Sequence, residues 1–106
     1  MGIQTHFMQV AKHSPETCPM YSDKYLQMTM DWFNGIKALS SKYDIELIGM
    51  YNDHPAHIVY MFWEAPSSDA MMAFMAEPAN QKMLCWQTME TKPVLTGEEI
   101  MQKLQK

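Results

Sequence analysis

Three side chains that can bind a metal or act as nucleophiles lie close together in one short stretch of the sequence. His13, Glu16 and Cys18 share it with Pro15 and Pro19. We expect a loop before the first helix here, because prolines interrupt regular structure. A thiol near a helix N-terminus is favoured as the thiolate, and His13 could then act as its base or as a metal ligand. The alternative is an ordinary turn in which Glu16 is solvated and Cys18 is a small buried hydrophobic residue.

A second group of candidate ligands lies in the middle of the chain. His54 and His57 are separated by two residues, with Glu64 further on. Imidazole binds zinc, nickel and copper, so we take both histidines as candidate metal ligands beside His13 and Cys18. His57 is also a candidate proton carrier, whereas His6 would join only if its strand face met His57. The alternative is a turn histidine and a sheet histidine with ordinary hydrogen bonds.

Apolar residues around these histidines could line a ligand pocket. On a strand over 57–63, alternation places His57, Met61 and Trp63 on one face and Tyr60 on the other. The predicted ligand contacts are Trp32, Tyr60, Met61 and Trp63. Methionine makes up 13 of the 106 residues, and flexible methionines fill irregular cores or adaptable pockets. A role for these thioethers in binding copper(I) is the less favoured alternative.

Composition excludes several classes of partner and reaction. The net charge is −4 and all eight basic residues are lysines, so the guanidinium groups and basic stripe expected of a nucleic-acid-binding protein are missing. The sequence contains no glycine-rich phosphate loop, GxSxG elbow or HExxH motif. Cys18 and Cys85 form no CxxC pair, and we expect free thiols, although a disulfide between them stays open.

The sequence also bears on where the protein acts. No apolar run approaches the roughly 20 residues that span a bilayer. The stretch 1–6 lacks the basic and apolar regions of a signal peptide. We therefore expect a cytoplasmic protein with no membrane partner.

Hydrophobic periodicity predicts the elements that position the candidate residues. Apolar residues alternate in the predicted strands and recur at three- and four-residue steps in the predicted helices. Ser22 is a plausible N-cap, and Thr96 with Glu99 has the spacing of a capping box. In chain order, we expect a strand over 5–12, a helix from 22 to 43, strands over 45–51 and 57–63, helices from 67 or 68 to 75 and over 78–84, a strand over 88–95 and a helix over 98–106.

This order predicts an α+β, ferredoxin-like βαββαβ fold in a single domain over 1–106. Its four-stranded antiparallel sheet carries both main helices on one face, and a short helix follows at the C-terminus. The strand over 57–63 is apolar on both sides, so the open face needs a cover. A second copy of the chain, packed sheet to sheet, is the simplest one. We expect the dimer contact and the functional site to meet on this open face.

Several local strings resemble the dimeric α/β-barrel superfamily. They are the loop His13-Ser14-Pro15-Glu16-Thr17-Cys18-Pro19, the run His57-Ile58-Val59-Tyr60 leading into Glu64-Ala65-Pro66, and the late strand Lys92-Pro93-Val94-Leu95. That superfamily includes small monooxygenases, muconolactone-isomerase-type enzymes, haem-degrading proteins and ligand- or nickel-binding proteins. The resemblance implies a homodimer and this fold, but not one reaction.

Three functions fit these observations. The first is a homodimer that binds nickel, copper or zinc, or a small ligand, through His13, Cys18 and His57. The second is a small monooxygenase- or isomerase-like enzyme that acts on an apolar or aromatic metabolite, with a histidine as proton shuttle. The third is an assembly protein that docks a partner on its open sheet or C-terminal helix. We favour the first.

Overall fold

The computed structural model describes residues 4–105 and confirms the predicted ferredoxin-like order of elements. Residues 1–3, part of the stretch searched for a signal peptide, and Lys106, the predicted end of the last helix, lie outside this range. Within it, no helix combines the length and apolarity needed to cross a membrane. The elements are β1 (Thr5–Lys12), the short 3-10 helix η1 (Pro15–Thr17), α1 (Asp23–Ser41), β2 (Glu46–Asp53), β3 (Ile58–Ala65), α2 (Ser68–Met75), α3 (Pro78–Met83), β4 (Thr88–Val94) and α4 (Gly97–Leu104).

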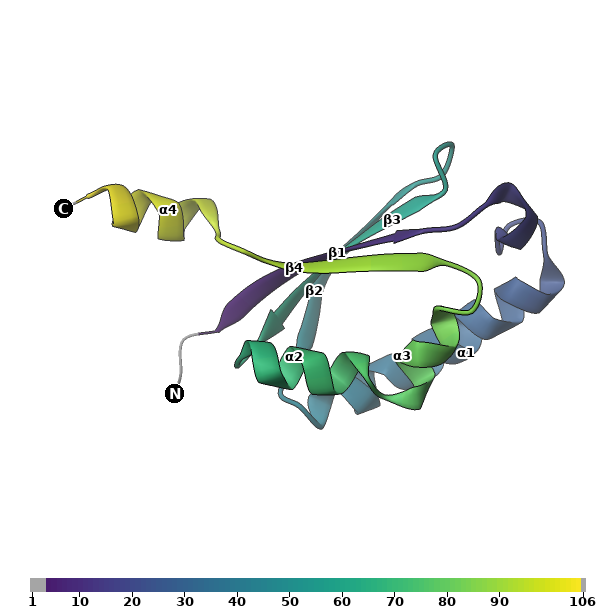
Figure 1. Ribbon diagram of the computed structural model, residues 1–106, viewed down its shortest axis with the longest axis horizontal. Coiled ribbons are helices and arrows are strands. Elements are labelled where there is room, and N and C mark those ends of the chain that lie inside the picture. Colours follow the sequence, from purple (N-terminus) through teal and green to yellow (C-terminus); the bar gives the residue numbers. More distant parts are fainter. Residues whose placement is uncertain (1–3, 106) are drawn as a thin grey trace.

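The four strands form one antiparallel sheet in the order β2-β3-β1-β4. β3 is a central strand, as its apolar sequence predicts. Pro93 lies on the edge strand β4, where a missing N–H is tolerated. Figure 1 shows α1, α2 and α3 on one side of the sheet, and no helix within residues 4–105 covers the other side. The sheet therefore has one face covered by helices and one open face.

Residues alternate between these two faces along β1 and β3. Phe7, Gln9 and Ala11 of β1 are buried under the helices, as are Met61 and Trp63 of β3. Intervening residues of both strands are half-buried on the open face. The helix-covered face thus holds the core.

Trp63 lies at the centre of this core. Its side chain is 0% exposed, and its ring centroid lies 5.2 Å from that of Phe74 and 6.5 Å from that of Trp32. The indole N–H of Trp63 donates to Gln9 Oε1 (3.2 Å), and the Gln9 amide donates to Thr91 Oγ1 (3.0 Å). Trp63 is therefore an enclosed core residue whose polar atom is satisfied.

The open face carries a continuous set of apolar side chains. A β-bulge in β2 between Leu47 and Gly49 adds Ile48 to it, and Ile48 and Tyr51 are 47% and 66% exposed. Tyr51 also packs edge-on against Phe62 of β3. We call the following residues the open-face patch: Met8, Val10, Ile48, Tyr51, Ile58, Tyr60 and Phe62.

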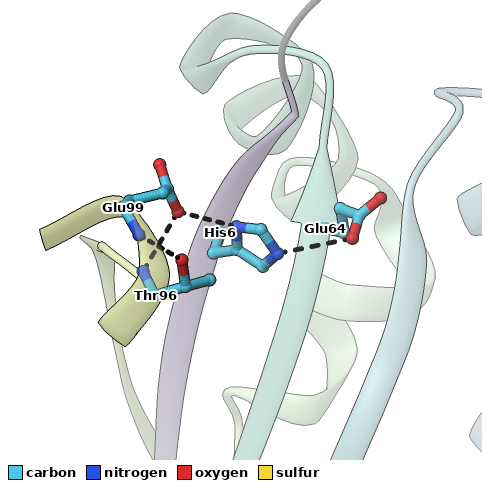
Figure 2. A network of polar contacts seen from close by, with 4 residues as sticks. All are labelled: His6, Glu64, Thr96 and Glu99. Carbon is cyan, nitrogen blue, oxygen red and sulfur yellow. Dashed lines mark hydrogen bonds and ion pairs between the residues drawn. The ribbon is translucent and has the colours of Figure 1, made fainter. Parts of the chain in front are cut away.

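The C-terminal helix α4 extends beyond the end of the sheet, apart from the other helices (Figure 1). It begins with the predicted capping box, in which Thr96 Oγ1 accepts from the Glu99 N–H and the Glu99 carboxylate accepts from the Thr96 N–H, both at 3.0 Å. The bond from the Thr96 N–H is the main reason that the pKa of Glu99 is lowered. His6 of β1 lies between Glu99 of α4 and Glu64 of β3, at ion-pair distance from both, and so links this helix to the sheet (Figure 2).

Most element boundaries differ from the sequence-based expectation by one or two residues, and two of the differences have a clear local reason. The strand expected from residue 45 begins at Glu46, because the Ile45 N–H bonds to the Ser40 carbonyl (3.0 Å) across a turn in which Asp44 has a φ of 57°. The stretch expected as a loop before the first helix contains η1, which Pro15 starts.

Candidate metal centre

Three candidate ligands meet at one end of the sheet. The metal-binding atoms of His13, Cys18 and His57 all lie within 4.8 Å of one another. We call these three residues the His–Cys cluster. His13 follows β1, Cys18 follows η1, and His57 ends the turn between β2 and β3. Residues distant in the sequence therefore form a set that could hold a metal ion.

Backbone hydrogen bonds hold the segments that carry the cluster. The His13 N–H donates to the His57 carbonyl (3.1 Å), which extends the pairing of β1 with β3 by one step. The Cys18 N–H donates to the Pro15 carbonyl (3.3 Å), and the His57 N–H donates to His54 (3.0 Å). His57 has a φ of 58°, a left-handed conformation that is costly for a residue with a side chain. The turn therefore fixes His57 in an unfavourable backbone geometry beside His13.

Several imidazole nitrogens in the cluster are buried without partners. Both ring nitrogens of His13 and Nδ1 of His57 make no hydrogen bond within residues 4–105. Buried polar groups are normally paired, and an ion or a water at the site is one recognised explanation for an exception. Cys18 is 1% exposed and carries a free thiol. The cluster thus offers donor atoms that the chain itself leaves unsatisfied.

Burial favours the neutral, metal-binding form of His13. It lowers the pKa of this imidazole below the ordinary 6.5, and the charges of nearby His57 and His54 lower it further. A neutral imidazole has a free lone pair for a metal, whereas a protonated one has none. The site therefore suits a cation at neutral pH.

The lowered pKa of His13 predicts acid sensitivity of the metal-free protein. The unfolded chain takes up a proton near pH 6.5, and the folded chain does so only at lower pH. The free energy of unfolding should therefore stay level above this pH and fall as the pH decreases through it, until the folded state is protonated too. Urea unfolding at about pH 5 to 8 measures this. A His13→Gln variant should show a shallower decline, and identical curves for both proteins would contradict the prediction.

Two of the cavities on the helix-covered side bear on the predicted site. His13 lines a small one of about 70 Å³ with Trp32, Met61 and Trp86, and its ring centroid lies 5.7 Å from that of Trp86. A larger one of about 500 Å³ lies between α2, α3 and β4 and is bordered by methionines but by no histidine. The cavity of about 500 Å³ is therefore separate from His13 and from the His–Cys cluster.

The other predicted site residues lie outside the cluster. His54 is exposed, with its ring centroid 5.8 Å from that of His57 and its Nε2 3.4 Å from the Tyr21 hydroxyl. Glu16 is exposed, and the pKa of its carboxyl is lowered mainly by its own backbone N–H and then by Ser14. His54 is thus a neighbour of the cluster.

His6 and Glu64 form a separate network, as Figure 2 shows. His6 Nε2 lies 3.3 Å from Glu64, and His6 Nδ1 lies 3.5 Å from Glu99 at ion-pair distance but outside hydrogen-bond geometry. His6 pairs with Glu64 at the end of β1 opposite to His13. The expectation that His6 might share a site with His57 is therefore wrong.

The four predicted ligand contacts do not share one cavity. Met61 and Trp32 line the small cavity with His13, Trp63 is enclosed in the core, and Tyr60 lies on the open face. The sequence-based expectation placed the site on the open face, but the cavity beside His13 belongs to the helix-covered face. The alternation along β3 correctly places Tyr60 and Met61 on opposite faces of the sheet. It does not show which of the two faces the helices cover.

Sequence reasoning missed two buried polar side chains. Gln9 is 1% exposed, and Asn80, 3% exposed, accepts from the Trp32 indole N–H (2.9 Å) and donates to the Phe74 carbonyl (2.8 Å). Gln9 lies on the same strand face as Phe7 and Ala11, so the alternation along the strand could have predicted that Gln9 is buried. Nothing comparable marks Asn80 in the sequence.

Comparisons with known proteins identify the fold. No protein-family model and no curated protein matches the chain. It is similar to the solved structure of a nipsnap family protein with unknown function from Agrobacterium tumefaciens, with 19% identity over 86% of each chain and a TM-score of 0.55. An uncharacterized NIPSNAP-like domain protein from Burkholderia xenovorans is 16% identical over 88% of this chain and 84% of that chain, with a TM-score of 0.56.

A third structure points to the same architecture. A Caulobacter crescentus protein described as a candidate antibiotic biosynthesis monooxygenase is 9% identical over 88% of this chain and 91% of that chain, with a TM-score of 0.57. Structural similarity at identities this low establishes the fold, but it leaves the reaction open. The chain shares its ferredoxin-like fold with these three solved structures.

Proposed function

We propose that the protein binds one transition-metal ion per chain through His13, Cys18 and His57. The observation that carries this is the convergence of a buried thiol and two imidazoles whose donor atoms lie within 4.8 Å of one another. Donors around a tetrahedral ion, with bonds of about 2.0–2.3 Å, are about 3.3–3.8 Å apart. The donor atoms would have to approach one another by about 1 Å to bind an ion, and rotation of the side chains can supply this movement.

The donor set narrows the choice of metal. One thiolate and two imidazoles suit zinc, copper and nickel, while calcium and magnesium prefer oxygen ligands. The unpartnered nitrogens of His13 and His57 support the proposal, because a bound ion would satisfy them. His54 is near enough to influence the site through its charge.

The proposal includes a homodimer in which a second copy covers the open-face patch. Ile48 and Tyr51 leave 47% and 66% of their surface exposed, and aromatic and aliphatic neighbours adjoin them. A contiguous apolar surface of this kind is rarely left to water. A two-fold arrangement would pair each patch with its own copy.

Titration of reduced, tag-free protein with Co²⁺, Zn²⁺, Ni²⁺ and Cu⁺ tests metal binding. We expect about one ion per chain, and for Co²⁺ an absorption band from charge transfer between thiolate and metal. Occupancy below about one tenth of a site per chain for every metal would overturn the proposal.

A small enzyme acting on an apolar metabolite remains the second candidate. The 500 Å³ cavity favours it, since its volume lies within the range of about 300–1,000 Å³ typical of ligand pockets. Phe7, Met71, Met75 and Met89 border this cavity. No histidine borders it, so a proton shuttle through His13 or His57 finds no support there, and we rank this function second.

A further inference from the structure

The number of protein donors bears on how a bound metal would be used. Within residues 4–105, the group of histidine, cysteine and acidic side chains at this site has three members. Zinc sites that serve only to hold a fold usually have four protein ligands, whereas reactive sites have three and keep one position for an exchangeable ligand. The His–Cys cluster resembles the second kind.

The small cavity beside His13 provides room for such a ligand. Its volume is about 70 Å³, which exceeds the roughly 10–15 Å³ that a cavity needs to hold one water molecule. The surrounding side chains of Trp32, Met61 and Met83 are buried and apolar. The cavity therefore has room for a molecule of a few atoms beside His13.

Trp86 lines this cavity and carries a hydrogen-bond donor that the described residues leave unused. Its side chain is 8% exposed, and its indole N–H is buried with no partner in the described part of the chain. Thr17 donates a hydrogen bond to the Trp86 carbonyl (3.2 Å), which ties this residue to the loop that carries Cys18. An indole N–H can only donate, so its partner must be an acceptor such as a small anion.

From these observations we propose that the metal keeps one coordination position for a small anion and that the Trp86 indole N–H donates a hydrogen bond to this anion. The inference rests on the proposed metal binding by His13, Cys18 and His57. It adds that the site is open to exchange. The anion would be hydroxide in plain buffer, and azide can replace it as a probe.

Azide titration of the Co²⁺-loaded protein tests the inference. We expect azide to change the visible spectrum of wild-type protein in a saturable way. Trp86→Phe should keep the Co²⁺ spectrum and bind azide about 10- to 100-fold more weakly, which is the usual effect of losing a hydrogen bond to a charged group. Trp63→Phe is the matched control, because Trp63 does not line this cavity and its N–H already bonds to Gln9. It should bind azide like wild type.

The outcomes separate this inference from metal binding itself. A missing Co²⁺ spectrum would refute the proposed function, whereas a Co²⁺ spectrum that azide leaves unchanged would refute only the open position. Equal azide affinity in wild type and Trp86→Phe would refute the role of Trp86. Azide binding that required His54→Gln would identify His54 as a fourth ligand and overturn the inference. If Trp86→Phe fails to fold, NMR of the Zn²⁺-loaded wild-type protein replaces it. The resonance of the Trp86 indole N–H should then shift when azide is added, and an unchanged resonance would refute the role of Trp86.

Discussion

Replacing Cys18 with serine should weaken Co²⁺ and Zn²⁺ binding by more than about 100-fold, beyond the 10- to 100-fold loss typical of an outer-shell partner. The thiolate is the only anionic donor of the His–Cys cluster, and its removal leaves two neutral imidazoles. The charge-transfer band of the Co²⁺ protein should disappear as well, because it arises from the sulfur. Competition with a chromophoric chelator measures the affinity.

Cys85→Ser is the matched control for this variant. Cys85 is also a free thiol, but it is exposed and outside the cluster. Its replacement should leave affinity and spectrum unchanged. Because Cys18 is buried, circular dichroism and urea unfolding of the metal-free variant must show that it still folds. Wild-type affinity in Cys18→Ser, or an equal loss in Cys85→Ser, would contradict the assignment.

Replacing Tyr51 with lysine should convert the proposed dimer to a monomer at micromolar concentration. Tyr51 is 66% exposed in the single chain, so the monomer can accommodate the lysine. In the sheet-to-sheet dimer, two unpaired ammonium groups would be taken from water into an apolar interface, at a cost of about 3 kcal/mol or more. Association should weaken by at least about 100-fold. Light scattering coupled to size-exclusion chromatography measures the mass.

Met72→Lys controls for the added charge. Met72 is 70% exposed on α2, which lies on the helix-covered side. This variant should remain dimeric, and both variants should keep metal affinity because neither position belongs to the His–Cys cluster. A monomeric wild type, or a Tyr51→Lys protein of unchanged mass, would exclude the open-face patch as the interface.

Most of the fold could be predicted from the sequence because each element carries its own period. The α1 residues Trp32 and Ile36 recur at helical spacing and are buried, and the capping box at Thr96 forms as its spacing indicates. Alternation along β3 separated Met61 from Tyr60. It could not show which of the two lies under the helices, since the period is the same for either assignment. For this reason the sequence-based expectation placed the site on the open face, whereas His13 lines a cavity on the helix-covered face.

The candidate site was predictable in its members and not in its assembly. Loop position and residue type indicated His13 and Cys18, but only the pairing of β1 with β3 brings His57 to them. Spacing alone could not distinguish His57 from His54. The turn geometry decides this, since it carries His57 into the cluster and leaves His54 at the surface. The unused N–H of Trp86 is invisible in the sequence, where a tryptophan indicates only a large apolar side chain.

The left-handed backbone at His57 sets folding stability against ligand binding at a single position. Glycine would adopt a φ of 58° without the cost of about 1–2 kcal/mol that a side chain incurs there. A glycine variant would thus relieve the turn and delete one donor of the cluster. Any gain in stability from glycine at this position would therefore come with the loss of one of the three donors that we propose to hold the metal.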